Sequence, residues 1–261
     1  MSYKQRLLVA CTTVLTIIFT LGKATPVDAA DRPDLVVAVP KLARGLEAGF
    51  TGNVDIRITY NIYDHLVRRD FVAQAKTGRT TFVPGLATSW KQISPTELVL
   101  QLRKGVKWHD GTEFTADDVA FAYGPERVYG EGAPVKKVAV STGVLDRVEV
   151  LGRYEVKMVW KYADPIMVHR LASKTSGIVS KAQYMSYARD GVPTSEWMKT
   201  AFKKISWQPI GTGPYKFESY VPGESIKFLA NDDYFMGPPA AKSITFVEVP
   251  EVAGRIAGIV A

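Results

Sequence analysis

Residues 98–119, LVLQLRKGVKWHDGTEFTADDV, combine a strand, a tight turn and a capped helix, and this combination decides the fold. Leu98, Leu100 and Leu102 occupy every second position, which is the pattern of a strand with one buried face. Gly105 interrupts the pattern, because glycine is common in turns and weakens strands. The stretch therefore predicts a half-buried strand over residues 98–102.

The turn after this strand is marked by two large aromatic residues. Trp108 and Phe114 flank the sequence His109-Asp110-Gly111. Because glycine accepts a positive φ, the chain can reverse there and place both rings on the same core. We name residues 105–115 the aromatic turn, and we interpret His109 as a hydrogen-bonded member of it.

A helix is predicted to begin directly after the aromatic turn. Thr115 is a good N-cap residue, and Asp118 stands three positions later, where a carboxylate completes a capping box. Val119, Ala122 and Tyr123 follow at helical spacing. Asp117 and Asp118 are therefore better explained by the helix dipole than as a catalytic carboxylate pair.

This stretch resembles the signature of the family 5 periplasmic solute-binding proteins, the peptide, dipeptide and nickel receptors of bacterial ABC importers. Three further blocks are similar to motifs of that family and occur in the same order: PGLATSW at 84–90, PIGTGPYKF at 209–217 and NDDYF at 231–235. We name residues 209–215 the glycine turn. The motif residues expected to hold the fold together are Trp90, Trp108, His109, Asp110, Gly111, Thr115, Gly211, Gly213, Pro214 and Tyr215.

The resemblance implies an α/β fold of the periplasmic binding protein-like type II class, with mixed sheets and helices. Such receptors have two lobes that close around a solute and deliver it to a membrane permease. Residues 30–250 would form the first lobe and residues 251–261 the start of the second. We expect a monomer whose partners are a small-molecule or peptide ligand and the permease subunits of an ABC importer.

Short strands separated by turn residues dominate the rest of the chain and predict a mixed α/β architecture. A helix is expected over 55–67, where Ile56, Tyr60 and Tyr63 recur at roughly helical spacing. The glycine- and proline-rich stretch 124–142 is expected to be a surface loop. Further strands are expected at 35–39, 148–150, 156–160, 226–230 and 244–249.

Residues 1–29 have the pattern of a cleavable export signal. Lys4 and Arg6 precede an uncharged apolar run, and small residues precede a cleavage point after Ala29. The run is too short for a membrane anchor, which needs about 20 apolar residues. Cys11 lies inside the apolar run, so we expect it to be part of the signal rather than a lipidated residue. The predicted location is the periplasm.

Composition supports a domain with a substantial core, and the charge pattern favours a solvated surface over a nucleic-acid-binding one. The chain is 46% hydrophobic and 11% aromatic and carries a net charge of +7. Its basic residues are scattered or in isolated pairs, without the aromatic interleaving of nucleic-acid-binding surfaces. The pairs are Arg68-Arg69, Lys136-Lys137 and Lys203-Lys204.

The sequence offers no credible catalytic or metal-binding set. His65, His109 and His169 are the only histidines, and no two have the spacing of a helical metal site. Nucleophile-elbow and phosphate-loop motifs are absent, and the glycine turn lacks the third glycine of a dinucleotide fingerprint. We therefore expect a binding protein without a cofactor, and we set aside the alternative of a secreted hydrolase.

The candidate ligand-facing residues lie on the loop 41–46 and on the following predicted helix. The loop follows a strand, at the edge where open α/β sheets bind ligands, and relatives of this family line their cleft there. Arg44 could pair with a ligand carboxylate, and Leu42 lies beside it. Tyr60 and Tyr63 could wall the cleft, although helix-spaced aromatics also fit a core role.

The family pattern also leads us to expect that the second lobe is missing, either because the chain is a fragment of a longer receptor or because it is a truncated product without transport activity. One lobe cannot enclose a ligand, so we expect the chain alone to bind peptides poorly. A solute other than a peptide, such as a nickel chelate, haem, glutathione or a sugar, remains an alternative at the same motifs.

Overall fold

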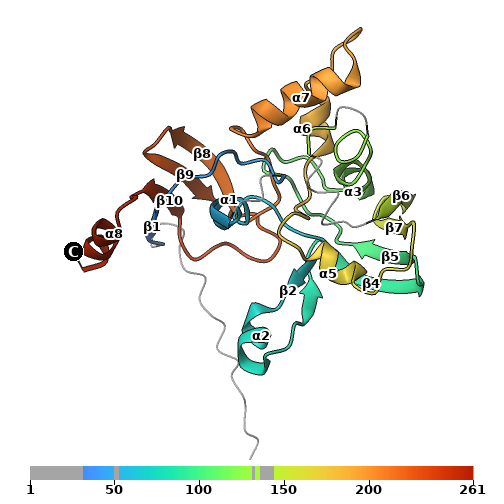
Figure 1. Cartoon of the computed structure of the whole chain (residues 1–261), viewed down its shortest axis with the longest axis horizontal. Helices are drawn as coiled ribbons and strands as arrows, with labels where there is room; N and C mark the ends of the chain where they lie inside the picture. The colour runs from blue at the N-terminus through green and yellow to red at the C-terminus, as the bar shows by residue number, and fades with distance from the viewer. Residues whose placement is uncertain (1–31, 50–52, 131–132, 136–143, 261) are drawn as a thin grey trace, which may run out of the picture.

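The structure is a computed structural model that describes residues 32–49, 53–130, 133–135 and 144–260 (Figure 1). The expected export signal 1–29, with its cleavage point at Ala29 and with Cys11, lies outside the described residues. So do residues 131–132 and 136–142 of the expected loop.

Two four-stranded sheets and one two-stranded ribbon make up the strands of the described part. The first sheet has the order β1-β10-β9-β8, with β1 and β10 parallel and the other pairs antiparallel. The second has the order β4-β5-β7-β6 and is antiparallel throughout. The bounds are β1 Asp34–Val39, β2 Val67–Arg69, β3 Phe82–Pro84, β4 Ala87–Ser94, β5 Glu97–Leu102, β6 Leu145–Gly152, β7 Glu155–Trp160, β8 Tyr215–Val221, β9 Ser225–Ala230 and β10 Ser243–Glu248.

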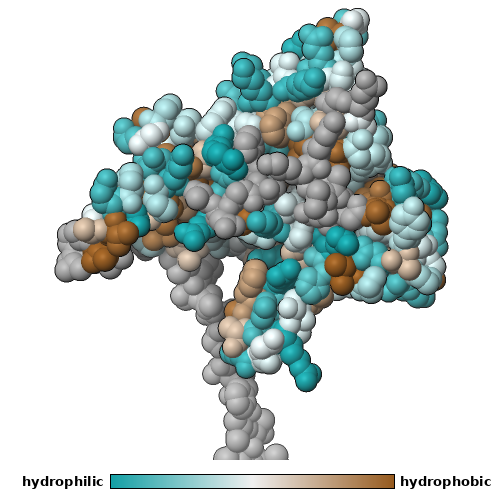
Figure 2. Space-filling view, in the orientation of Figure 1, coloured by the Kyte–Doolittle hydropathy of each residue, from teal (hydrophilic) through white to brown (hydrophobic). Residues whose placement is uncertain are grey.

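Helix α3 packs against β6 and β7 of the second sheet, α6 packs against α3 and α7, and α5 contacts β2. The ribbon β2–β3 and helix α2 project from one side of the molecule, and α8 extends from the end of β10 (Figure 1). Hydrophobic residues are visible over α8 in Figure 2, where Val252 and Ile256 are exposed. The helices are α1 Asn53–Thr59, α2 Phe71–Thr77, α3 Ala116–Ala122, α5 Met167–Leu171, α6 Lys181–Met185, α7 Thr194–Ile205 and α8 Val252–Val260.

The predicted strand 98–102 is confirmed as β5, which lies between β4 and β7 in the second sheet. Its leucines at 98, 100 and 102 are buried in the main hydrophobic core. The predictions for 35–39, 148–150, 156–160 and 226–230 are also confirmed as parts of β1, β6, β7 and β9, and the strand expected over 244–249 is β10, which ends one residue earlier.

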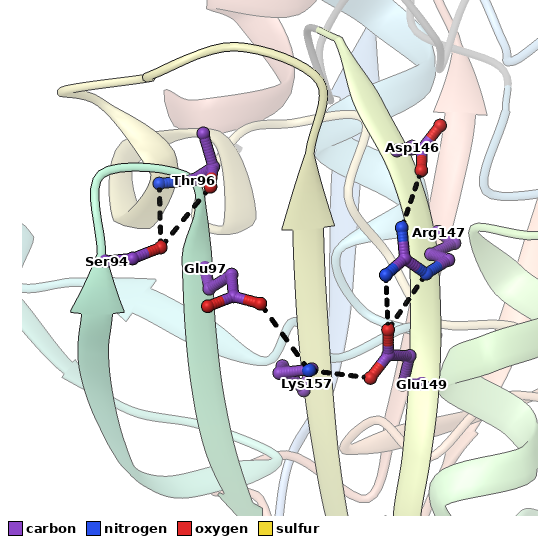
Figure 3. Close-up of polar contacts among 7 residues, drawn as sticks. All are labelled: Ser94, Thr96, Glu97, Asp146, Arg147, Glu149 and Lys157. Atoms are coloured by element: carbon purple, nitrogen blue, oxygen red, sulfur yellow. Dashed lines mark hydrogen bonds and ion pairs between the residues drawn. The ribbon is translucent and has the colours of Figure 1, made fainter.

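The other face of the second sheet is polar, which fixes the side that packs against the core. Lys157 on β7 lies between carboxylates of both neighbouring strands, 2.8 Å from Glu149 and 3.5 Å from Glu97 (Figure 3). Arg147 adds ion pairs to Glu149 at 2.6 Å and to Asp146 at 2.8 Å. Exposed ion pairs of this kind stabilise a fold only weakly, so the row specifies register more than it stabilises the fold.

The aromatic turn has the conformation that its sequence predicts. Gly105 and Gly111 have φ values of 73° and 87°, a region that side chains other than glycine rarely adopt. Trp108 and Phe114 are buried, and their rings meet edge to face with centroids 6.1 Å apart. The turn thus folds two aromatic rings onto one core.

Helix α3 begins after Thr115 as predicted. The Thr115 backbone N–H donates to the Asp118 carboxylate at 3.0 Å, which is the reciprocal bond of a capping box. The Lys181 N–H donates to the other Asp118 oxygen at 2.9 Å. Asp118 therefore joins the start of α3 to the start of α6 and has a structural role.

The predicted helix over 55–67 is wrong beyond Thr59. The chain turns after α1, and residues 67–69 form strand β2. The carbonyl oxygens of Asn61 and Ile62 accept hydrogen bonds from Tyr215 and Gly213 instead of continuing a helix. A long-range contact thus satisfies the backbone where local periodicity favoured helix.

The loop predicted over 124–142 is irregular where it is described, but it is not all surface. Arg127 and Val128 are each only 1% exposed. Arg127 donates to Glu47 Oε1 from Nη2 at 2.6 Å and from Nε at 3.2 Å. Tyr184 donates to the same oxygen at 2.8 Å, so a buried ion pair with a third polar partner anchors the loop.

Candidate functional site

Hydrogen bonds connect the loop 41–46 to strand β10 of the first sheet and to helix α1. Leu42 is buried, and its N–H donates to Glu248 Oε2 on β10 at 2.8 Å. Arg44 donates to buried Asp55 on α1 from its backbone N–H at 3.0 Å and from its guanidinium at 2.9 Å. The loop is therefore held in place at two points. The Arg44 side chain remains 62% exposed, and Lys41 is the other exposed member of this loop, so solvent or a ligand can reach both.

The two candidate tyrosines lie in different surroundings. Tyr60, at the end of α1, is 40% exposed, and its ring centroid is 4.9 Å from that of His65. Tyr63 is 3% exposed and packs in the core. Burial raises the pKa of both phenols, so both are neutral near pH 7. That these tyrosines contact a ligand stays a prediction.

Both tyrosines line one pocket of about 120 Å³, which we name the Tyr60 pocket. It brings together the turn after α1, strand β2, the beginning of α2 and the segment near residue 234. Its walls combine aromatic rings with two arginines. The lining residues are Tyr60, Tyr63, Asp64, His65, Val67, Arg68, Arg69, Phe71, Ala172, Pro214 and Tyr234.

Asp64 supports this region from inside and was not among the candidates derived from the sequence. It is buried and accepts hydrogen bonds from the Tyr234 hydroxyl at 2.8 Å and from Thr212 Oγ1 at 3.1 Å. Burial raises the pKa of Asp64, and the two hydroxyl donors oppose that shift. The sequence signal that could have identified Asp64 is its place within an apolar run, because an ionisable residue buried there needs hydrogen-bond partners.

The glycine turn passes directly over the backbone that follows α1. A Cβ atom on Gly211 would lie 1.8 Å from the Ile62 carbonyl oxygen, and one on Gly213 would lie 2.6 Å from it. The Gly213 N–H donates to that oxygen at 2.8 Å, and the Tyr215 N–H donates to Asn61 at 3.0 Å. These positions require glycine because two backbone segments are in contact there.

His109 joins the aromatic turn to the glycine turn. Its Nδ1 accepts from the Gly211 N–H at 3.2 Å, and this assigns the proton of the neutral ring to Nε2, which donates to the Gly213 carbonyl at 3.0 Å. Burial lowers the pKa of His109 to about 4, so the ring is neutral at pH 7. Both ring nitrogens of His109 are thus hydrogen-bonded to the glycine turn.

The remaining motif residues lie near these two turns. Asp110 accepts from the Thr112 N–H at 3.0 Å in the exposed part of the aromatic turn. Pro214 lines the Tyr60 pocket, Tyr215 starts β8, and half-buried Trp90 packs against the core from β4. The motifs therefore build the joint between the two large sheets rather than one exposed site.

The described residues contain no group of three or more histidine, cysteine, aspartate or glutamate side chains placed to hold a metal ion. Within the same ranges, every helix is too short or too polar to cross a membrane.

Known proteins similar to this chain are binding proteins. The oligopeptide-binding protein AppA of Bacillus subtilis is 34% identical over 161 residues, which are 60% of this chain and 27% of the relative. The dipeptide-binding protein of Escherichia coli is 29% identical over 215 residues, 75% of this chain and 37% of the relative. Heme-binding protein A of Haemophilus influenzae is 27% identical over 214 residues, 75% of this chain and 36% of the relative.

The fold is similar to solved structures of this group. The structure of AppA in complex with a nonapeptide superposes with a TM-score of 0.68 at 29% identity, covering 87% of this chain and 42% of that chain. This similarity confirms the expected α/β fold of the type II periplasmic binding protein-like class.

The chain matches only part of each curated relative. The chain spans 27–37% of the length of the three curated relatives named above. Residues 81–260 match the family described as bacterial extracellular solute-binding proteins, family 5 Middle. Since this match covers more than half of the chain, the protein belongs to the family 5 bacterial extracellular solute-binding proteins.

Proposed function

We propose that the chain is part of the solute-binding component of an ABC importer and that the solute is a peptide. The observation that carries this proposal is the family match over residues 81–260, together with relatives that are named for binding oligopeptides and dipeptides. The activity is binding and delivery to permease subunits, not catalysis. Residues 30–250 would contribute the first of two lobes, and residues 251–261 the beginning of the second.

In this proposal the loop 41–46 presents ligand contacts from a rigid base. The exposed Arg44 guanidinium already forms an ion pair with the Asp55 carboxylate. A ligand carboxylate would be a second partner of the same guanidinium. Closure of a second lobe would remove water from such a contact and strengthen it. Tyr60 directly follows α1, and its partly exposed ring lines the Tyr60 pocket.

Haem is a second candidate solute because one relative is named for binding it. Two chimeras distinguish the candidates. Each joins this chain through Val249 to the remainder of a relative, either the Bacillus oligopeptide-binding protein or the Haemophilus haem-binding protein. We expect the first chimera to bind oligopeptides in calorimetric titration and the second not to bind haem. Haem binding by the second chimera, with no peptide binding by the first, would overturn the peptide proposal.

Export to the periplasm is proposed on the pattern of residues 1–29, and the absence of nucleic-acid partners on the scattered basic residues; a monomer is proposed with the family assignment. Intact-mass analysis of the exported protein tests the first point, with a mass beginning at Ala30 expected. A mass that retains Met1, or one that carries a diacylglycerol on Cys11, would contradict it.

A further inference from the structure

Helix α2 presents its large apolar side chains to solvent instead of to the core. Phe71 and Val72 are 64% and 66% exposed, and no residue of α2 is buried. Gln74 is half-buried, and its Oε1 atom is buried without a hydrogen-bond partner among the described residues. A surface helix normally turns its apolar side inward and its polar side outward. The reversed orientation of α2 is typical of a helix whose exposed side meets a partner.

The exposed side of α2 combines apolar and basic residues. Residues 71, 72, 75 and 76 are all exposed. Because positions four apart lie on the same side of a helix, they form one continuous surface, which we name the α2 face. Figure 2 shows hydrophobic residues at the surface over α2. The α2 face consists of Phe71, Val72, Ala75 and Lys76, and exposed Arg79 follows directly after the helix.

The segment that carries the α2 face is strongly basic. Residues 67–84 contain four cations and one carboxylate, which leaves a net charge of +3. The carboxylate, Asp70, accepts from the Ala73 N–H at 2.8 Å as the N-cap of α2. None of the cations forms an ion pair with another described residue. They are Arg68, Arg69, Lys76 and Arg79. Unpaired cations around exposed apolar side chains complement a negatively charged surface with an apolar interior.

The α2 face is held on a short support that projects from the body of the molecule. Strands β2 and β3 pair antiparallel below the helix. The Asp70 N–H donates to the Thr81 carbonyl oxygen at 3.0 Å, and Gly78 ends the helix with a φ of 70°. Figure 1 shows the ribbon and α2 extending away from the two large sheets. A broad, flat surface can therefore approach the α2 face.

We propose that the α2 face binds the surface of a bilayer that contains anionic lipids. Phe71 and Val72 would enter the boundary between headgroups and acyl chains, and the surrounding cations would lie against lipid phosphates. A stable protein interface buries about 800 Å² on each partner, and two large apolar side chains on one short helix offer far less, so a lipid surface suits this face better. The inference goes beyond the proposed function and holds whichever solute the complete receptor carries.

Vesicle cosedimentation tests the proposal. The protein that begins at Ala30 is used, because the apolar run in residues 1–29 would itself enter a bilayer. One set of vesicles contains phosphatidylcholine alone, and the other contains equal parts of phosphatidylcholine and phosphatidylglycerol. We expect half-maximal binding to the anionic set at about 1 mM lipid, binding to the neutral set at least about tenfold weaker, and loss of binding at high salt.

Two results would overturn the proposal. The first is equal binding to both sets of vesicles, which would exclude recognition of the anionic headgroups. The second is no binding to the anionic set, which would make an acidic protein surface the better partner for the α2 face.

Substitutions locate the contact on α2. Phe71→Ser should weaken binding to the anionic vesicles about tenfold, whereas Tyr162→Ser, at a 68% exposed aromatic residue outside the segment, should leave it unchanged. Lys76→Gln should weaken it about fivefold, and Lys199→Gln, at an exposed lysine of α7, is its matched control. All four side chains are exposed, so thermal midpoints should stay unchanged. Equal binding within either pair of variants would place the contact elsewhere and refute the assignment.

Discussion

His109 makes the joint between the aromatic turn and the glycine turn sensitive to acid. Its pKa is about 4 in the folded protein and 6.5 in the unfolded chain, so the unfolded chain binds more protons between these pH values. The free energy of unfolding should therefore fall as the pH drops from about 6.5 to about 4, by on the order of 3 kcal/mol from His109. Urea denaturation at pH 7.5, 5.5 and 4.5 measures this slope.

His65 shifts in the same direction, so the parent protein reports the sum of both histidines. His109→Gln removes one of them and should give a shallower pH profile than the parent. A parent profile that is flat over this range, or a variant profile as steep as the parent, would show that the His109 ring does not act as described.

Gly211 is predicted to tolerate no side chain. Gly211→Ala places a Cβ 1.8 Å from the Ile62 carbonyl oxygen, so two backbone segments must separate, at a cost of about 3 kcal/mol. Gly152 is the matched control because a Cβ there meets nothing within 4 Å, and Gly152→Ala should leave stability nearly unchanged. Equal denaturation midpoints for the two variants would contradict the close approach.

Glu47 and Arg127 are expected to depend on each other. Arg127→Met leaves the Glu47 carboxylate buried without its cation and should cost about 3–5 kcal/mol. Adding Glu47→Gln should recover much of this loss, since the uncompensated charge disappears. Free energies of unfolding of both single variants and the double variant form a cycle, and additive effects would rule out the coupling.

At the scale of elements, the aromatic turn is expected to contribute more than any single exposed ion pair. Trp108→Ala removes a buried ring that packs against Phe114 and should destabilise the protein by about 3–5 kcal/mol. Trp90→Ala, at a half-buried tryptophan on β4, should cost less. A Trp108→Ala midpoint equal to that of the parent would mean that Trp108 is not a core residue.

The sequence-based predictions were correct for features that neighbouring residues specify. They were wrong where hydrogen bonds to a distant backbone segment set the end of an element. Strand β5, the positive φ of Gly111 and the cap of α3 are specified by neighbouring residues. The end of α1 is not, because it depends on hydrogen bonds from Gly213 to Ile62 across the fold. Local periodicity contains no information about a partner 151 positions away.

The candidate site shows the same division. Arg44 was proposed from its place after a strand; its side chain is exposed, and its contact with a ligand stays a prediction. The polar role of Asp64 was not identifiable, since it depends on Tyr234 and on a pocket assembled from several segments. Arg127 was hidden in a stretch whose glycines and prolines favoured a surface loop.

At the scale of the whole molecule, the first sheet combines β1 from near the beginning of the chain with β8, β9 and β10 from near its end. The loop 41–46 and the segment after β10 therefore leave the same sheet edge, joined by the Leu42 to Glu248 hydrogen bond. In a two-lobe receptor this places the candidate ligand loop beside the crossing between the lobes.

We propose that this chain supplies one wall of a cleft that needs a second lobe. An open face leaves peptide termini in water, where an ion pair is worth about 0–1 kcal/mol, and association costs at least about 4 kcal/mol in lost freedom. Calorimetric titration of residues 30–261 and of the Bacillus chimera with the same oligopeptides tests this claim most directly. We predict micromolar binding by the chimera and none by residues 30–261, whereas micromolar binding by residues 30–261 alone would contradict the account.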